Sequence, residues 1–336
     1  MNARPNLQCR LRRRPAGVAQ ADDFDLSIGA VRTPEEGEVQ IRNQFLSVEP
    51  AMRGWIADAD NYASQIGIGD VMRALAAGEV VASRHSEYRE GDLVAGWFGW
   101  QEYATVAVDK IVRRVLETDL PLSLSLGVLG INGATALLAL TKIGQPKQGE
   151  TIVVSTASGA VGSAVGQIAR LLGCRAVGVA GGPVKTGLCL STFGYDAAVD
   201  YRAPGWEAAL AASCPDGVDI YFDNVSGPTS DVVHQQLAHG ARIVVCGTAA
   251  FTDWSRWPQG PRIERRLLTR RARMEGFVIF DHMGDYEAAI ERLAGWVRSG
   301  VLRYREDVLE GMQACPDALA GLYRGENLGK RVIRLY

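Results

Sequence analysis

The sequence predicts an α/β fold that joins a doubly wound parallel sheet to a domain made of short β-strands. Short segments of alternating polarity, separated by glycines, fill the first 125 residues, as in sheets and barrels. From residue 126 onward, apolar strands alternate with helices, which is the pattern of a buried parallel sheet. We therefore expect domains at 1–125 and 126–300, and a C-terminal segment, 301–336, that returns to the first domain through an apolar strand at 331–336.

The first domain contains four segments with the composition of strands. They are residues 38–43, 78–83, 92–96 and 102–108. The N-terminus carries five arginines but no apolar stretch of the kind found in signal peptides, so we expect a first strand with basic edges there.

The second domain shows a regular alternation. Strands are expected at 151–155, 175–180, 197–201, 218–222, 241–246 and 274–280. Helices are expected at 133–143, 161–172, 185–193, 205–213, 230–237 and 285–299.

The overall composition excludes several classes of protein. Basic and acidic residues number 36 and 38, so the net charge of −2 favours neither nucleic acid nor an acidic membrane surface as a partner. No apolar stretch is long enough to span a bilayer. The six cysteines form no C-x-x-C pair, and a chain of this length needs no disulfide framework, so we expect reduced thiols in a cytoplasmic protein.

A glycine-rich turn lies between a predicted strand and a predicted helix. It reads Ala157-Ser158-Gly159-Ala160-Val161-Gly162, the dinucleotide pattern with alanine in place of the first glycine. Small residues let the backbone approach a pyrophosphate, which then sits at the positive end of the helix. The alternative is a turn that only packs strand on helix, but the repeated strand–helix units that follow favour nucleotide binding.

The end of the second strand indicates which dinucleotide is bound. An NAD site usually has a carboxylate there, about 20 residues after the turn, to bind the ribose 2′-hydroxyl. Here the strand runs into Gly181-Gly182-Pro183, and Lys185 follows, with Tyr201 and Arg202 after the next strand. A lysine without a competing carboxylate suits the 2′-phosphate of NADPH. The alternative interpretation is that Lys185 is a solvated helix residue.

Seven short motifs spread over nearly the whole chain resemble one family, the zinc-free alkenal/one reductases of the medium-chain dehydrogenase/reductase superfamily. This group contains leukotriene B4 dehydrogenase (prostaglandin reductase) and curcumin reductase. The motifs are 46–54 (LSVEPAMRG), 158–163 (SGAVGS), 166–169 (GQIA), 215–219 (PDGVD), 221–225 (YFDNV), 271–277 (RARMEGF) and 325–330 (GENLGK).

The resemblance implies a GroES-like β-barrel domain, a Rossmann domain, NADPH as cofactor, no metal and a homodimer. It implies a reaction in which hydride reaches the β-carbon of an enone or enal and a proton reaches the α-carbon. The cofactor contacts implied by the matching motifs are Gly159, Ala160, Val161, Gly162, Lys185, Tyr201, Asn224, Cys246, Gly247, Thr248, Thr252, Phe277, Val278, Ile279 and Asn327.

The cysteine positions argue independently against zinc. Zinc-dependent relatives carry a catalytic cysteine and histidine in the first domain and four clustered cysteines after a Gly-Asp turn. Here the turn at 91–92 leads into AGWFGWQ, and no cysteine occurs between Cys9 and Cys174. Without a Lewis acid, the enzyme has to polarise the substrate carbonyl through hydrogen bonds.

The proton donor is where the sequence departs from the family. The tyrosine that usually follows the Cys-Gly of the fifth strand is replaced, and Thr252 occupies its position. A second family tyrosine before the glycine turn is replaced by Leu137. Tyr62 is the remaining catalytic candidate, with a surface aromatic as the alternative. Arg53 is a second candidate, although an ion pair or a backbone clamp is the favoured interpretation. The lost tyrosines leave two other functions open, a quinone reductase and a non-catalytic NADPH-binding protein.

Overall fold

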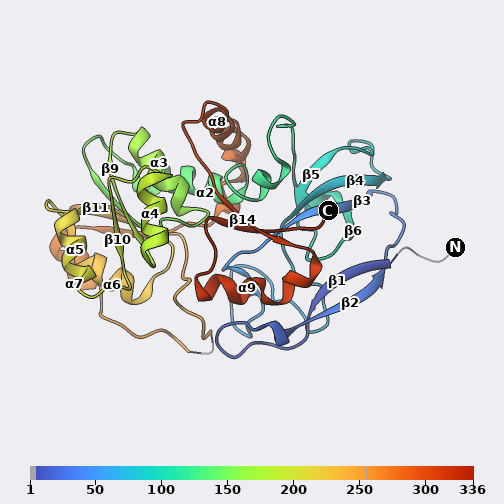
Figure 1. Ribbon diagram of the computed structural model, residues 1–336, viewed down its shortest axis with the longest axis horizontal. Coiled ribbons are helices and arrows are strands. Elements are labelled where there is room, and N and C mark those ends of the chain that lie inside the picture. The colour runs from blue at the N-terminus through green and yellow to red at the C-terminus, as the bar shows by residue number, and fades with distance from the viewer. Residues whose placement is uncertain (1–4, 255) are drawn as a thin grey trace. The chain divides into compact units, whose positions relative to one another are not determined.

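The chain forms two compact units in the computed structural model, which describes residues 5–254 and 256–336 (Figure 1). The first, here called the β unit, comprises Met1–Leu126, Thr252–Arg256 and Glu306–Tyr336. The second, the α/β unit, comprises Gly127–Phe251 and Trp257–Arg305. The short segment Thr252–Arg256 therefore groups with the β unit, although the chain on both sides of it belongs to the α/β unit.

The β unit is built on a mostly antiparallel sheet. Its strand order is β14-β15-β3-β4-β5-β7, β6 adds a second partner to one end of β3, and β1 and β2 form a separate ribbon. The strands are β1 Pro5–Leu11, β2 Phe24–Ala30, β3 Glu38–Ser47, β4 Ala76–Ser83, β5 Leu93–Gly96, β6 Tyr103–Ala107, β7 Ile111–Arg114, β14 Glu306–Glu310 and β15 Lys330–Arg334. The helices are α1 Met52–Trp55 and α9 Cys315–Arg324, with 3-10 turns at Ala21–Asp23, Val108–Lys110, Leu122–Leu126 and Met312–Ala314.

The core of the β unit follows the two-residue period of its strands. In β3, Val39 and Ile41 are completely buried, while Gln40 between them is partly exposed. Trp100 is also completely buried, and its indole N–H donates to the Ser47 carbonyl at 3.0 Å. The last strand, β15, pairs with β3 in antiparallel register, with Val332 opposite Ser47, so the end of the chain extends the sheet formed near its start.

The α/β unit contains a parallel sheet of the Rossmann type, as expected. Its strand order is β10-β9-β8-β11-β12-β13. The strands are β8 Thr151–Ser155, β9 Arg175–Ala180, β10 Ala197–Asp200, β11 Val218–Asp223, β12 Leu237–Val245 and β13 Arg273–Gly276. The helices are α2 Ile131–Ala139, α3 Gly162–Leu171, α4 Pro183–Ser191, α5 Trp206–Ser213, α6 Gly227–Gln235, α7 Glu264–Arg270 and α8 Tyr286–Arg298, with a π turn at Leu140–Gly144 and a 3-10 segment at Ile279–Asp285.

Both faces of the parallel sheet are covered, which explains why its strands are almost entirely apolar. On one face, Tyr221 and Ile243 join a core with Leu210 of α5 and Val233 of α6. On the other face, Ile220 and Val244 lie against the turn that follows α2, within 3.7 Å of the position of a Cβ on Gly144. Side chains therefore alternate between two helical layers along each strand.

Two expected elements differ from the structure. The strand expected at 274–280 ends at Gly276, and a 3-10 segment follows from Ile279. The helix expected at 230–237 begins earlier, at Gly227, because Pro228 in its first turn has no N–H to satisfy. Leu237, expected in that helix, opens β12 instead.

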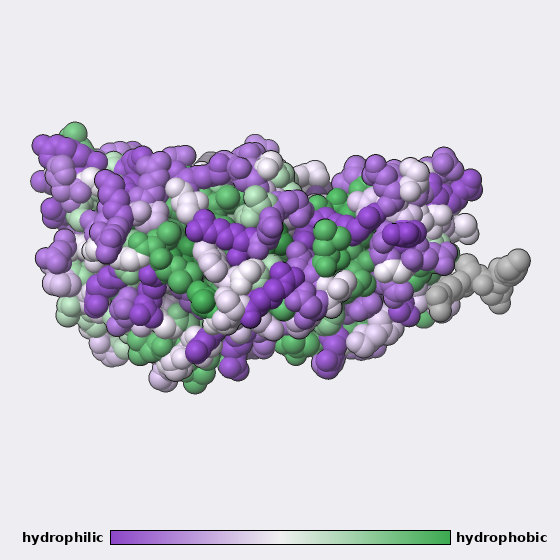
Figure 2. All heavy atoms as spheres, turned by 90° about the horizontal axis from the view of Figure 1, so that it is seen from above, coloured by the Kyte–Doolittle hydropathy of each residue, from purple (hydrophilic) through white to green (hydrophobic). Residues whose placement is uncertain are grey.

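The surface carries apolar side chains singly rather than in one area. Large exposed ones, such as Ile28, Ile68 and Leu116, come from different elements, and the face shown in Figure 2 mixes polar and apolar groups. Among the described residues, no helix has both the length and the hydropathy needed to cross a bilayer.

Candidate cofactor site

The carboxyl ends of six parallel strands lie at one edge of the sheet in the α/β unit. The chain runs from β8 to β9 and β10 on one side, and from β11 to β12 and β13 on the other, so the topological switch lies between β8 and β11. Ligands of open α/β sheets bind at such a switch. Predicted cofactor residues follow every strand: Gly159–Gly162 after β8, Lys185 after β9, Tyr201 after β10, Asn224 after β11, 246–248 after β12 and 277–279 after β13.

The glycine turn is tightly folded on its own backbone. Thr156 has a left-handed φ of +51°, and its carbonyl accepts the Gly159 N–H at 2.8 Å. A Cβ on Gly162 would lie 2.3 Å from the Thr156 carbonyl oxygen and 2.9 Å from the Ala157 Cα. Because backbone atoms cannot move aside, only glycine fits at 162, the first residue of the ten-residue helix α3. The turn and the helix that it opens therefore fit a dinucleotide pyrophosphate.

Tyr195 supports this turn from within the core. Its hydroxyl donates to the Gly162 carbonyl at 2.6 Å. Its ring fills the space beside Gly166 on α3, where a Cβ would lie 2.1 Å from the Tyr195 Cζ atom. Complete burial raises the pKa of Tyr195 well above its usual value, so the hydroxyl stays protonated and keeps donating.

Asp223 organises the switch point between β8 and β11. The residue is 2% exposed. Its carboxylate accepts five hydrogen bonds, from the hydroxyls of Ser155, Tyr221 and Ser230 and from the backbone N–H groups of Val225 and Ser226. These donors satisfy the buried carboxylate and fix the path of the chain after β11.

Asn224 is held at the same place by Ser155. The Ser155 hydroxyl accepts the Asn224 N–H at 2.8 Å, and the Asn224 side-chain amide donates to the Ser155 carbonyl at 2.7 Å. The amide predicted to contact the cofactor is therefore fixed between the ends of β8 and β11.

Basic and aromatic groups gather after β9 and β10. Gly181 lies against both Tyr201 and Arg202: a Cβ at Gly181 would be 2.9 Å from a Tyr201 ring carbon and 2.9 Å from the Arg202 Nε. The Arg202 guanidinium lies 5.7 Å from the Tyr201 ring centroid. Lys185 is half-buried in the first turn of α4. No carboxylate ends β9 itself, which suits a 2′-phosphate.

Asp200 is the acidic residue that ends the neighbouring strand, and it is engaged with the backbone. Its carboxylate accepts the N–H groups of Gly182 at 2.8 Å and Arg202 at 2.9 Å. These bonds lower the pKa of Asp200, so it is ionised at neutral pH and fixes the loop that carries Gly181 and Gly182.

The ends of β12 and β13 complete this edge of the sheet. The N–H groups of Cys246 and Gly247 both donate to the Asp223 carbonyl, and a Cβ on Gly247 would lie 2.7 Å from the Asn224 carbonyl oxygen. Burial raises the pKa of Cys246 to about 12, so its thiol is neutral. Thr248 is exposed.

The predicted residues after β13 differ in what they can offer a ligand. Phe277 and Ile279 are buried in the unit, with Phe277 stacked on His282 at a centroid distance of 4.7 Å. Val278 between them is only half-buried. The side chain of Val278 and the backbone of this segment are therefore its accessible groups.

Three predicted site residues belong to the β unit. Tyr62 is 59% exposed, and its N–H donates to the Asn61 side chain at 2.7 Å. The Asn327 amide donates to the Gly329 carbonyl at 2.9 Å and shapes its own turn. Thr252 opens the segment Thr252–Arg256 and is half-buried. The structure therefore groups these three apart from the strand ends of the α/β unit.

Trp254 brings the segment Thr252–Arg256 close to α1. A Cβ on Gly54 would lie 2.8 Å from a Trp254 ring carbon and 2.5 Å from the Asn61 amide nitrogen. The absence of a side chain at Gly54 therefore lets Trp254 and Asn61 converge, one residue away from Tyr62.

Arg53 has the structural role expected for it. Its guanidinium donates to the carbonyl groups of Gly17 at 2.5 Å and Pro15 at 3.1 Å. Burial lowers the pKa of Arg53. The prediction of a backbone clamp is confirmed, and Arg53 fixes the loop before β2 onto α1.

Three residues that shape the site were not predicted from the sequence: Tyr195, Ser155, and Asp223 as a hydrogen-bond acceptor. Tyr195 meets Gly162 and Gly166 only through the fold, and no local pattern connects them. A usable signal for Asp223 is an acidic residue that ends an otherwise apolar buried strand, because a carboxylate there needs several donors.

These features define a nucleotide-dependent oxidoreductase with a Rossmann-type unit and a β unit. Residues 7–113 match the family described as the N-terminal domain of oxidoreductase, and residues 160–295 match the family described as zinc-binding dehydrogenase. In the described part of the chain, no group of three or more His, Cys, Asp or Glu residues is arranged to hold a metal ion.

Relatives match over nearly full length. The NADPH-dependent curcumin reductase of Escherichia coli (strain K12) is 40% identical over 98% of this chain and 97% of its own. The NADP(+)-dependent 2-alkenal reductase of Nicotiana tabacum is 35% identical over 98% and 97%. The structure of CurA from Vibrio vulnificus in complex with NADPH has a TM-score of 0.92 and 39% identity, over 98% of this chain and 99% of its own. This chain belongs to the alkenal/one and curcumin reductase group of the medium-chain dehydrogenase/reductase superfamily.

Proposed function

We propose that this protein uses NADPH to reduce a C=C bond conjugated to a carbonyl group in an enone or enal. The observation that carries the proposal is its similarity, over 98% of the chain, to a curcumin reductase and a 2-alkenal reductase, whose named substrates contain that group. The turn at Gly159–Gly162 and the ordered ends of β9, β11 and β12 supply residues that fit the cofactor.

The chain's own residues would bind and orient the cofactor and the substrate. NADPH supplies the hydride that adds to the β-carbon of the substrate. The N-terminus of α3 would hold the pyrophosphate, Lys185 and Tyr201 would bind the 2′-phosphate, and Asn224 would contact the nicotinamide half. Tyr62 is the group that we propose to hydrogen-bond the substrate carbonyl, where negative charge develops, and to supply the proton that the α-carbon takes up. The remaining predicted contacts, from Cys246 to Thr252, Phe277 to Ile279, and Asn327, complete the proposed cofactor site.

The proposed function is tested by NADPH oxidation with a panel of substrates. We expect turnover with enals and enones such as 2-alkenals and curcumin, and a product that keeps its carbonyl while losing the C=C bond, checked by mass spectrometry and NMR. Turnover restricted to small quinones would identify a quinone reductase instead. Tight NADPH binding without turnover of any acceptor would identify a non-catalytic binding protein.

Replacing Lys185 with alanine is expected to raise the KM for NADPH at least tenfold, because one charge-assisted bond to the 2′-phosphate is lost. The KM for NADH serves as the internal control, since NADH has no 2′-phosphate, and it should change less than twofold. Equal changes for both cofactors would contradict a phosphate contact and support the interpretation of Lys185 as a solvated helix residue.

Replacing Tyr62 with phenylalanine is expected to lower kcat/KM for enones by about tenfold to a hundredfold, the usual effect of losing one hydrogen bond to a developing oxyanion. The Kd for NADPH should stay the same. Tyr304→Phe, at an exposed tyrosine of the α/β unit, is the matched control. An unchanged kcat/KM in Tyr62→Phe would remove Tyr62 from the reaction and leave solvent as the proton source.

We also propose a homodimer that is located in the cytoplasm. β13 is the last strand of the parallel sheet, all four of its residues are exposed, and Met274 on it is 39% exposed. Such an edge is suited to pairing with a second copy. Sedimentation should give twice the chain mass. Met274→Pro removes an edge N–H, because the N–H of Phe277, and by alternation that of Glu275, points at β12, so this variant should give the single-chain mass. A wild-type monomer at micromolar concentration would contradict the dimer.

The cytoplasmic location is supported by six free thiols in the described chain.

A further inference from the structure

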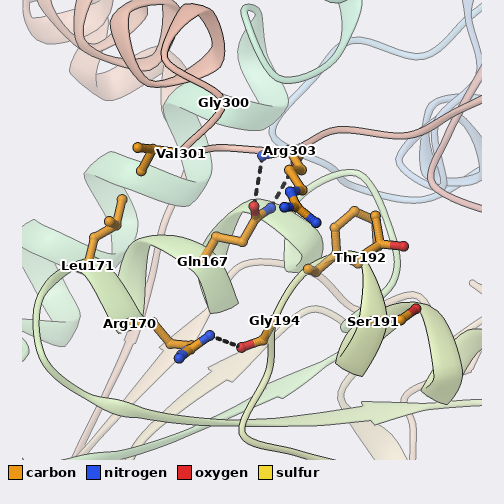
Figure 3. A pocket seen from close by; sticks show the side chains of 10 residues that line it. Gln167, Arg170, Leu171, Ser191, Thr192, Gly194, Gly300, Val301 and Arg303 are labelled. Atoms are coloured by element: carbon orange, nitrogen blue, oxygen red, sulfur yellow. Dashed lines mark hydrogen bonds between the residues drawn. The ribbon is translucent and has the colours of Figure 1, made fainter.

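A cavity of about 410 Å³ opens in the α/β unit, away from the glycine turn (Figure 3). Its walls come from the second half of α3, from the residues after α4 and from the segment after α8. Because α3 and α4 both begin at the cofactor edge of the sheet, the cavity lies at the opposite ends of the two helices. Its volume is in the range of small-molecule sites.

The cavity contains two arginines in different states. The Arg170 guanidinium donates to the Gly194 carbonyl at 2.5 Å and pairs with Asp196 at 3.4 Å, so its charge is balanced. Arg303 is exposed, and its guanidinium forms no ion pair with any residue in the described ranges. The cavity therefore has one uncompensated positive charge.

Hydroxyl groups add to the polar lining. Thr192 directly follows α4 and lines the cavity with Arg303 (Figure 3), whereas the hydroxyl of Ser191, the last residue of α4, donates to the Gly187 carbonyl at 2.8 Å. The carboxyl ends of α3 and α4 bring partial negative charge to this side of the unit, and Arg170 offsets part of it through its bond to Gly194. The Arg303 guanidinium and the Thr192 hydroxyl are a donor set that suits carboxylate or phosphate oxygens.

The backbone that carries Arg303 is fixed before any ligand binds. Gln167 of α3 is buried, and its amide oxygen accepts the Arg303 N–H at 2.8 Å. Its amide nitrogen donates to the Arg303 carbonyl at 2.8 Å and to the Ser163 carbonyl at 2.8 Å. Only the Arg303 side chain has to order on binding, which keeps the entropic cost low.

We propose that this cavity binds a small organic oxyanion through Arg303 and Thr192, and that its occupancy is linked to NADPH binding. Both walls of the cavity are connected to the glycine turn through hydrogen bonds. Gln167 connects the Arg303 segment to Ser163, in the first turn of α3. Tyr195, which follows Gly194 of the cavity, donates to the Gly162 carbonyl.

The binding test uses calorimetric titration of the NADPH-saturated protein with citrate and, in a second series, with inorganic phosphate, at constant ionic strength. Saturation with NADPH prevents either anion from occupying the cofactor's own phosphate site. We expect one saturable site per chain for at least one anion. Tighter binding of citrate points to a carboxylate ligand, and tighter binding of phosphate points to a phosphate ester. No saturable binding of either anion would overturn the proposal.

Arg303→Ala is expected to weaken this binding about tenfold or more. Arg305→Ala is the matched control, because Arg305 is an exposed arginine two residues further along that does not line the cavity. Equal weakening in both variants would show a general charge effect and contradict a built site. Thermal unfolding of both variants checks that they remain folded.

The link is tested by measuring the Kd for NADPH with and without saturating anion. We expect a change of at least twofold in the wild-type protein and none in Arg303→Ala, since linkage requires each ligand to change the affinity of the other by the same factor. An equal Kd under both conditions would refute the link between the two sites.

Discussion

Replacing Gly162 with alanine is expected to weaken NADPH binding by about tenfold to a hundredfold. The new Cβ would lie 2.3 Å from the Thr156 carbonyl oxygen and 2.9 Å from the Ala157 Cα, and both are backbone atoms of the turn itself. The turn can accept the methyl group only by opening, which displaces the N–H groups at the start of α3 from the pyrophosphate. Fluorescence titration of NADPH measures the change.

Gly187→Ala provides the matched control. Gly187 lies in α4 of the same unit, and a Cβ there meets no atom within 4 Å. Alanine in a helix interior stabilises by about 0.5–1 kcal/mol relative to glycine, so this variant should be slightly more stable and bind NADPH normally. An equal Kd for Gly162→Ala and Gly187→Ala would mean that the turn does not contact the cofactor.

Replacing Asp223 with alanine is expected to lower the free energy of unfolding by about 3–5 kcal/mol, because several buried donors lose their acceptor together. The side chains of Tyr221 and Ser230 are buried, so water cannot replace the acceptor that their hydroxyls would lose. The chain after β11 would also lose its anchor, so NADPH affinity should fall as well. Urea unfolding, followed by circular dichroism, gives the stability.

The control for Asp223 is Asp216→Ala. Asp216 is exposed in the turn before β11, and its removal should change stability by no more than about 0.5 kcal/mol. Asp223→Asn keeps one acceptor oxygen and should fall between the two. If Asp223→Ala and Asp216→Ala had the same urea midpoint of unfolding, the hydrogen-bond network around Asp223 would contribute nothing to stability.

Local pattern was sufficient for most of the parallel sheet. The apolar runs at 151–155 and 175–180 became strands with the expected bounds, because a strand buried on both faces has to be apolar throughout. The same rule failed at 277–280. That segment is also apolar, but β13 ends at Gly276. The Phe277 N–H still donates to the Val245 carbonyl at 3.0 Å, while its ring stacks on His282 and the chain continues into a 3-10 segment. An apolar run looks the same in a strand and in a buried turn.

Those parts of the candidate site that consist of residues adjacent in sequence could be predicted. The parts formed by residues distant in sequence could not. The turn 157–162 and the missing carboxylate after β9 could be recognised because function there depends on neighbouring residues. Tyr195 and Gly162, or Trp254 and Gly54, meet only after folding, and their contacts depend on the absence of a Cβ. Composition and spacing carry no information on such pairs.

The contact between Tyr195 and Gly166 also constrains how this sequence can change over time. A larger residue at position 166 requires a smaller one at 195, since the tyrosine ring occupies the space of any Cβ. A smaller residue at 195 in turn removes the hydroxyl that holds Gly162. A replacement at either position alone therefore disturbs the turn. Both positions can change together only if another residue takes over the support of the turn. Libraries that vary one position at a time will find both positions invariant, whereas paired libraries at 166 and 195 can reach alternative solutions.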